Sequence, residues 1–236
     1  MKLIKLELKR NNIRTYLVAS AVSCIVLLGL IYFIAYVAQQ EDSSAREIVF
    51  RSYTNIFRLT GLISLVVFST MSAIMYSRLI IGEYTGKRAA LLFSYPVSKS
   101  RILLAKLLLV YMFTSISMFI CTSIPYIVFS ITESVSPIVV QDVMTIGLVI
   151  DALETSCVAV LSLGAIGVVS LRIGFIKKSV PTTLICTLLL SSIYGNASIN
   201  TNSIPSRVLI SGIGLIIAVT VAAELSCKVN KMEVEG

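Results

Sequence analysis

The 236-residue sequence has no histidine and no tryptophan, and only 14% of its residues are charged. Without histidine, the chain cannot build a Ser–His catalytic pair, an HExxH zinc site, a histidine-box oxygenase centre or a histidine-ligated haem. It also lacks a G-x-x-x-x-G-K-[ST] segment, so it has no P-loop for nucleotide phosphates. Its aspartates, Asp42, Asp142 and Asp151, fall near the ends of apolar runs, where an intramembrane aspartyl pair would not lie. These absences argue against an enzyme.

Cysteine is also scarce, with five residues in the chain. The odd number and the absence of metal-ligand spacing predict neither a disulfide framework nor a metal site. Cys24, Cys121, Cys157 and Cys186 lie inside apolar runs, and Cys227 lies near the C-terminus. We therefore expect small, buried apolar side chains at these positions, and no cofactor bound by this chain.

Apolar residues, by contrast, make up 56% of the chain, and its mean hydropathy is +0.92. A soluble domain of this length cannot bury so much apolar surface, so lipid is the expected solvent for most of it. A helix needs about 20 apolar residues to cross roughly 30 Å of hydrocarbon. The apolar runs predict one transmembrane domain, residues 1–236, with six spans. These spans are residues 15–39, 59–77, 107–131, 146–171, 179–196 and 208–227.

The basic residues predict how these spans are oriented. All but four of the 20 Lys and Arg residues precede the first span, follow the last span, or lie in the second or fourth connection. The exceptions are Arg46, Arg51, Arg58 and Arg207. Because positively charged loops stay in the cytoplasm, both termini are predicted to be cytoplasmic. The expected fold class is therefore an all-α integral membrane protein with six transmembrane helices, located in the cell (plasma) membrane. We do not expect a nucleic-acid partner from the net charge of +8.

The N-terminal segment, residues 1–12, has a helical pattern of its own. Lys2, Lys5 and Lys9 share one helical face, and apolar residues lie opposite them. This pattern predicts an amphipathic helix in the inner membrane interface. The alternative is a plain positive flank that only orients the first span.

The segment before the second span, residues 41–58, also has aromatic residues at helical spacing. Phe50, Tyr53 and Phe57 predict an amphipathic helix that leads into this span. An interfacial anchor is the favoured role, and a gate or substrate contact is the alternative. Asp151 and Glu154 are expected at the outer end of the fourth span, where pairing with Arg58 or Arg207 is one possibility.

The loop 78–106 is the most distinctive segment of the chain. It reads RLIIGEYTGKRAALLFSYPVSKSRILLAK, with an apolar run at Ala89–Phe93 and Pro96 just after it. This run predicts a short cytoplasmic helix, which the proline ends. The apolar side chains of such a helix suit a groove on a partner protein. An interfacial helix without a partner is the alternative.

The stretch 83–106 resembles the loop between the second and third spans of ABC type-2 permeases, which often read E-x-x-x-G-T-x-x-x-L-L-x-x-P-V-S-R with a basic residue further on. The matching positions are Glu83, Leu91, Leu92, Pro96, Val97, Ser98, Lys99 and Lys106. The chain departs from the pattern at Lys87 and Arg88, and Gly86 stands one residue early. The run Phe93–Pro96 is similar to small Gram-positive permeases for peptide export or for bacteriocin and lantibiotic immunity.

The resemblance implies a membrane subunit that forms the translocation pathway of an ABC exporter. ATP and Mg²⁺ would be bound by a separate ATPase subunit, and a second permease copy or a related permease would complete the transporter. The loop would contain the cytoplasmic coupling helix through which the ATPase acts. The implied coupling residues are Glu83, Ala89, Leu91, Leu92, Phe93, Pro96, Lys99 and Arg101. The basic residues of the loop either contact the ATPase or bind anionic lipid headgroups.

The cargo is expected to be apolar or amphipathic, because the spans offer aromatic, thioether and hydroxyl groups but few charges. The resemblance favours a peptide, and a lipid or a small drug is the alternative. The candidate residues of a translocation cavity are Phe33, Phe68, Met71, Met75, Tyr111, Met112, Phe113 and Tyr126. Packing against lipid is the alternative for each of them.

Two functions of other classes stay open. One is a membrane immunity or sensor module that transports nothing. The other is a carrier driven by an ion gradient, although such carriers usually place ionisable groups at mid-membrane depth, where this chain has few. Stoichiometric capture of an ATPase separates the exporter from both.

Overall fold

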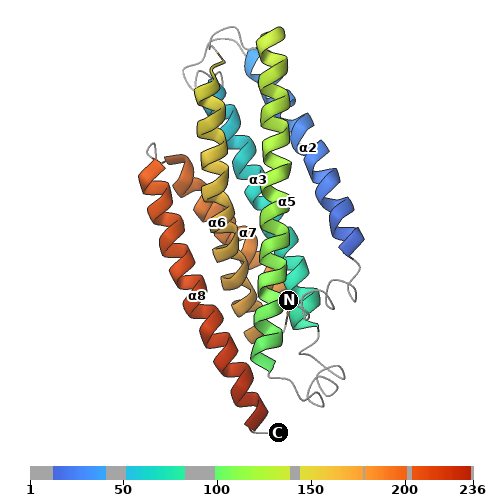
Figure 1. Cartoon of the computed structure of the whole chain (residues 1–236), viewed down its shortest axis with the longest axis vertical. Helices are drawn as coiled ribbons and strands as arrows, with labels where there is room; N and C mark the ends of the chain where they lie inside the picture. Colours follow the sequence, from blue (N-terminus) through green and yellow to red (C-terminus); the bar gives the residue numbers. More distant parts are fainter. Residues whose placement is uncertain are drawn as a thin grey trace.

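The computed structural model describes residues 13–40, 52–82, 99–138, 144–177, 179–200 and 204–234. All of the regular structure in these ranges is helical (Figure 1). The helices are α2 (Ile13–Gln40), α3 (Tyr53–Tyr76) with the π-helix η2 (Ser77–Ile81), α5 (Lys99–Val135), α6 (Ile146–Lys177), α7 (Val180–Asn200) and α8 (Ile204–Val234). Six helices of the described residues are long and apolar enough to cross a membrane, which confirms the six apolar helices predicted from the sequence.

Successive helices run in opposite directions, so the bundle has two distinct ends (Figure 1). We call the end where α2 begins and α8 finishes the loop end, because η2 and the start of α5 lie there and flank residues 83–98. The opposite end, where α3 and α6 begin, is called the cavity end. The side of the membrane that each end faces stays a prediction, and the predicted helix in residues 1–12 lies outside the described residues.

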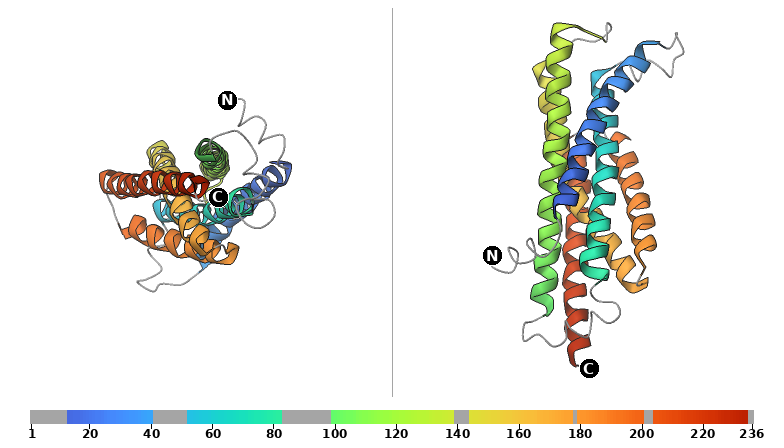
Figure 2. Two further views of the ribbon diagram at one scale, coloured as in Figure 1. Left: turned by 90° about the horizontal axis from the view of Figure 1, so that it is seen from below. Right: turned by 90° about the vertical axis from the view of Figure 1, so that its right-hand side faces the viewer.

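Helices α3, α5 and α6 form the centre of the bundle, whereas α2 and α8 lie at opposite sides of it (Figures 1 and 2). The central helix α6 contacts α3, α5, α7 and α8. Glycines allow these close contacts, since a Cβ added at Gly164 would overlap the ring of Tyr111, and one added at Gly174 would overlap the hydroxyl of Thr183. Small residues bring helix backbones together in the same way throughout membrane bundles.

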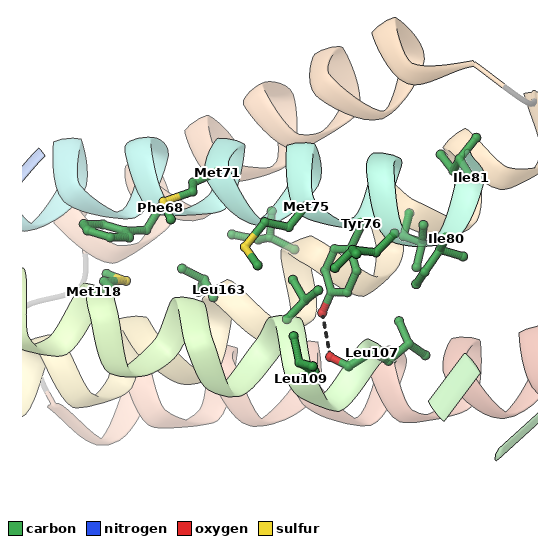
Figure 3. Close-up of a cluster of buried hydrophobic side chains, with 14 of the residues drawn as sticks. Phe68, Met71, Met75, Tyr76, Ile80, Ile81, Leu107, Leu109, Met118 and Leu163 are labelled. Atoms are coloured by element: carbon green, nitrogen blue, oxygen red, sulfur yellow. Dashed lines mark hydrogen bonds between the residues drawn. The ribbon is translucent and has the colours of Figure 1, made fainter. Parts of the chain in front are cut away.

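The main core lies between α3, α5 and α6, and its side chains are apolar with few exceptions (Figure 3). On α3 it contains Phe68 and Met75, and on α5 it contains Val110 and Met118. A second, smaller core at the cavity end is largely aromatic. There, Phe57 makes an edge-to-face contact with Tyr126, at 5.0 Å between ring centroids.

The aromatic cluster corrects one sequence prediction. Helix α3 begins at Tyr53, so the residues before the predicted span at 59–77 belong to the same continuous helix. Tyr53 and Phe57 are buried in the aromatic core rather than exposed as interfacial anchors. They are buried because α5 extends beside them as far as Val135. Phe50, the third predicted residue, lies outside the described residues.

The cysteines are all free, and the prediction that they are buried is confirmed for one of them. Cys121 is buried and lies with its Sγ 3.4 Å from the carbonyl oxygen of Ser20, so it joins α5 to α2. Cys157 and Cys227 are exposed, which the sequence prediction did not anticipate. Lipid offers the same apolar surroundings as a protein interior, so the apolar run around Cys157 did not indicate which way it faces.

Candidate functional site

Two regions of the bundle gather polar side chains, one at each end. The region at the loop end, which we call the neck, is formed by η2 and the first turns of α5. In η2 the hydrogen-bond pattern widens, and the amide of Gly82 donates to the carbonyl of Ser77 at 2.9 Å. Single π-turns inside helices occur frequently at functional sites. The neck directly precedes residues 83–98, which hold most of the predicted coupling residues.

Two hydrogen bonds join the helices of the neck. The Nζ of Lys106, which is 1% exposed, donates to the carbonyl oxygen of Leu79 in η2 at 3.1 Å. In return, the hydroxyl of Tyr76 donates to the carbonyl oxygen of Leu107 at 3.3 Å (Figure 3). A charged group inside a membrane bundle is costly unless it has a partner, and a backbone carbonyl serves as one here. The neck therefore holds the two ends of the predicted coupling loop together.

The predicted coupling residues lie mostly beyond this neck. Glu83, Ala89, Leu91, Leu92, Phe93 and Pro96 lie outside the described residues. Lys99 is the first residue of α5, and Arg101 is exposed in its first turn. Their assignment to coupling stays a prediction.

The second region is a cavity of about 160 Å³ at the cavity end. Side chains from α3, α5, α6, α7 and α8 surround it. The lining includes Thr54, Arg58, Gly61, Leu65, Met118, Tyr126, Asp151, Thr155, Ala159, Tyr194 and Arg207. Along α3 the lining extends from Thr54 to Leu65, which is about 16 Å of helix.

Charged groups lie at one level of this cavity. Arg58 on α3, Asp151 on α6 and Arg207 on α8 all line it near the ends of their helices. Arg207 is 5% exposed, and its Nη1 donates to the hydroxyl of Thr155 at 3.0 Å. Its charge interacts favourably with Asp151 and unfavourably with Arg58. We call this level the mouth.

The other end of the cavity has no charged side chain. Leu65 and Ala159 lie about two helical turns further into the bundle than the mouth, and with Met118 they form what we call the floor. The hydroxyl of Tyr126, between the two levels, donates to the carbonyl of Phe57 at 2.9 Å and so faces the α3 backbone. The cavity is therefore charged at the mouth and uncharged at the floor.

A buried carboxylate lies at the cavity end of the bundle, between the start of α3 and the end of α5. Glu133 on α5 is 2% exposed, and its Oε1 accepts hydrogen bonds from the Tyr53 hydroxyl at 2.6 Å and from the Ile138 amide at 2.7 Å. These bonds tie the start of α3 to the end of α5. Within the described parts of the chain, no group of three or more Cys, Asp or Glu side chains has the arrangement of a metal site.

The eight predicted cavity residues are distributed over different surroundings. Phe68, Met71 and Met75 are buried in the main core (Figure 3). Tyr111 and Phe113 are half-buried and pack against it. Phe33 on α2 and Met112 on α5 are exposed on the outside of the bundle. Tyr126 is the member of the set that lines the cavity described above. A role of these residues in translocation stays a prediction.

The charged residues of the cavity agree with the sequence-based expectations more closely than the eight predicted cavity residues do. Pairing of Asp151 or Glu154 with Arg58 or Arg207 was one possibility, and the structure brings Asp151, Arg58 and Arg207 to one mouth. Asp151 and Glu154 are both exposed on α6, and Glu154 does not line the cavity. Thr155 and Tyr194 also line the cavity, and they were not predicted from the sequence. In the sequence, each of them is only a polar residue beside an apolar run. Such a residue does not show which face of its helix is turned toward a cavity.

Comparison with known proteins places this arrangement in a family. A model of the ABC-2 family transporter proteins matches residues 3–190, which covers most of the chain, including the loop 78–106, four of the six apolar helices and part of the fifth. An uncharacterized protein, YcbO of Bacillus subtilis (strain 168), is 24% identical over 200 residues, which cover 84% of this chain and 85% of that protein. No solved structure matches.

Proposed function

Because the chain belongs to the ABC-2 family of transporter proteins, we propose that it forms the translocation pathway of an ATP-driven exporter for an apolar or amphipathic peptide. Family membership makes the chain a membrane subunit of an ABC transporter. The observation that carries the proposal is the family match itself, since it includes the whole loop with the apolar run Ala89–Phe93. The six apolar helices support a multi-pass protein, which we propose to lie in the bacterial plasma membrane.

The proposed source of energy is a separate ATPase subunit that binds ATP and Mg²⁺. Its groove would receive Leu91, Leu92 and Phe93, because an apolar helix face gains stability when it leaves water. ATP binding would then move the loop 83–98. The neck supports this mechanism, since Lys106 and Tyr76 join the helices on either side of the loop and would move them as a unit.

The proposed transporter also contains a second permease copy or a related permease. A pathway between two bundles would give Phe33 and Met112 a place in it, since both are exposed on the outside of this bundle. Helix α2 offers a surface for close contact, because Ala19 is exposed and the hydroxyl of Ser23 is bonded back to the Ala19 carbonyl at 2.9 Å. Small residues four apart favour such helix pairs in membranes.

Capture of the ATPase tests the proposal. The chain is co-expressed with a candidate ABC ATPase subunit, purified through a tag on the chain, and the captured ATPase is quantified. We expect stoichiometric capture by the unchanged chain, and at least about tenfold less with Leu92→Glu or Phe93→Glu, because a charge in an apolar groove costs several kcal/mol. Val135→Glu is the matched control, since Val135 is an exposed apolar residue at the other end of the bundle.

Three results would contradict the proposal. Unchanged capture by both loop variants would remove the loop from the contact. Peptide uptake into inside-out vesicles that needs a sodium or proton gradient instead of ATP would indicate a carrier. Peptide binding without any transport or ATPase capture would indicate an immunity or sensor module.

A further inference from the structure

Two of the five cysteines meet between α2 and α5, near the middle of α2. Cys121 on α5 is buried, and its Sγ donates to the carbonyl oxygen of Ser20 on α2 at 3.4 Å. Cys24 lies one helical turn after Ser20, and its side chain is tilted back over that turn, because side chains in a helix lean toward the N-terminus. The Cys24 and Cys121 thiols are hydrogen-bonded to each other there. The structure therefore places two free thiols in direct contact.

The two helices are close at this point. The Cys121 thiol reaches the α2 backbone, so little more than one cysteine side chain separates α2 from α5 here. A disulfide needs roughly 4.4–6.8 Å between its Cα atoms and side chains that point toward each other. Because the Cys24 and Cys121 thiols are already in contact, a bond between them can form without a change in how the helices pack.

The surroundings of the pair determine which reagents reach it. Cys24 is half-buried, and the next residues of α2, Ile25 and Val26, are exposed on the outside of the bundle, where lipid is expected. Cys121 lies in the main core with Leu27. A charged molecule enters such apolar surroundings only at a high cost in free energy, whereas a neutral one dissolves in them. The pair is therefore open to neutral reagents from the lipid rather than to charged reagents from water.

We propose that Cys24 and Cys121 form a redox-active pair, which a neutral, lipid-soluble two-electron oxidant converts to a disulfide between α2 and α5. Two S–H bonds break and one S–S bond forms. Both electrons and both protons pass to the oxidant, so a quinone would become a hydroquinone, and an azo compound would become a hydrazine.

The bond would tie a weakly packed helix to the centre of the bundle. Only 17% of the apolar stretch of α2 is buried, against 44% for α5. In the proposed exporter, the disulfide would prevent any step in which α2 moves away from α5. This consequence rests on the proposed function, whereas formation of the bond depends neither on the ATPase nor on transport.

The test uses the full chain in nanodiscs of phosphatidylcholine, with Cys157→Ala, Cys186→Ala and Cys227→Ala to remove the other thiols. Diamide, a neutral azo oxidant, is added, the remaining thiols are alkylated after denaturation, and peptide mass spectrometry identifies the bonded peptides. We expect a bond between Cys24 and Cys121 within one chain, and its reversal by dithiothreitol. Tetrathionate, a charged oxidant of thiols, should form the bond at least about tenfold more slowly, because a charge is costly in apolar surroundings.

Moving one thiol by a single position gives the matched control. Cys24→Ala combined with Ile25→Cys keeps the number of thiols but places one at a position that is 72% exposed on the outside of the bundle. This variant should form the disulfide at least about tenfold more slowly, because its sulfur no longer faces Cys121. Oxidation of the unchanged pair should raise the thermal unfolding midpoint by about 4 °C or more, since the bond restricts the unfolded chain. The midpoint before oxidation verifies that each variant is folded.

The proposal is overturned if diamide leaves both thiols free, or if the shifted variant forms the bond as fast as the unchanged pair. A bond between two chains, seen as a dimer on a denaturing gel without reductant, would also overturn it, since Cys24 would then face a second copy. Equal rates with tetrathionate and diamide would overturn the assignment to a lipid-soluble oxidant. A lower midpoint after oxidation would contradict a bond that leaves the helix packing unchanged.

Discussion

At the loop end, Lys106 is surrounded by packed helices and donates to a backbone carbonyl, whereas at the cavity end Arg58 and Arg207 border open space. Both ends thus place basic groups inside the bundle, but the surroundings differ. A cation whose donor is bonded to the backbone of a neighbouring helix stabilises that helix pair. At the cavity end, Arg207 donates to the hydroxyl of Thr155, and its charge is repelled by that of Arg58. One end therefore contains a cation packed between helices, and the other contains two cations that line a cavity.

The two ends also differ in how closely their helices approach. At the loop end, Gly174 of α6 lies against Thr183 of α7, and an added Cβ would overlap the threonine hydroxyl. At the cavity end, a Cβ added at Gly61 would lie 3.0 Å from the hydroxyl of Tyr126, beside the cavity. The first site has no room for a larger residue, and the second has space next to it. Matched substitutions at the two ends therefore test the comparison.

The largest effect is expected from leucine at the two glycines. Gly174→Leu should lower the free energy of unfolding by about 3 kcal/mol or more, since overpacking in a tight helix contact displaces both helices. Gly61→Leu should lower the free energy of unfolding by about 1 kcal/mol or less. The new leucine side chain can enter the cavity, and leucine has a higher helix propensity than glycine. The measurement is the thermal unfolding midpoint of purified protein in one detergent.

The control for this pair is Gly29→Leu on α2, where nothing lies within 4 Å of an added Cβ. This variant measures only the difference in helix propensity between leucine and glycine. Equal midpoints for Gly174→Leu and Gly29→Leu would contradict the close contact between α6 and α7. A Gly61→Leu protein as unstable as Gly174→Leu would contradict the open space at the cavity end.

The helices themselves could be predicted from the sequence, because uncharged runs of about 20 residues have few alternatives to a membrane span. Their lengths could not. Helix α3 begins at Tyr53 and includes Arg58, since a charged residue is tolerated inside a helix when its side chain reaches a cavity. The π-helix at Ser77–Ile81 was not predicted from the sequence, and the hydrogen bond that its Leu79 carbonyl accepts comes from Lys106 on another helix.

The cavity was harder to predict than the helices for a physical reason. In a soluble protein, apolar residues identify the buried face of a helix, but lipid is as apolar as the protein interior. Phe68 and Phe33 therefore look alike in sequence, although the first is buried in the core and the second is exposed. Charges were the better guide, since Asp151 and Arg207 were both considered as partners and both line the mouth.

An intermediate effect is expected from removing the two kinds of cation. Lys106→Met should lower the free energy of unfolding by about 2 kcal/mol, because it removes a buried hydrogen bond and leaves the Leu79 carbonyl without this donor. Arg58→Met should cost less than about 0.5 kcal/mol or be stabilising, because it relieves the repulsion with Arg207. Thermal unfolding of both proteins, beside Arg101→Met at an exposed position, gives the comparison. If Arg58→Met lowers the free energy of unfolding more than Lys106→Met does, then Arg58, and not Lys106, is the cation that stabilises the helix packing.

The smallest effect is expected from two buried tyrosine hydroxyls that both donate to a backbone carbonyl. Tyr126→Phe should cost about 1 kcal/mol, since its bond to the Phe57 carbonyl is 2.9 Å long and holds α5 to α3 beside the cavity. Tyr76→Phe in the neck should cost about half of that, because its bond to the Leu107 carbonyl is 3.3 Å long and hydrogen bonds weaken with distance. Unfolding midpoints of the two variants and of the double variant measure both terms. A greater loss of stability for Tyr76→Phe than for Tyr126→Phe would contradict this order. It would mean that the Tyr76 hydrogen bond stabilises the neck more than its length of 3.3 Å indicates, and that Lys106 is not the main link between the helices of the neck.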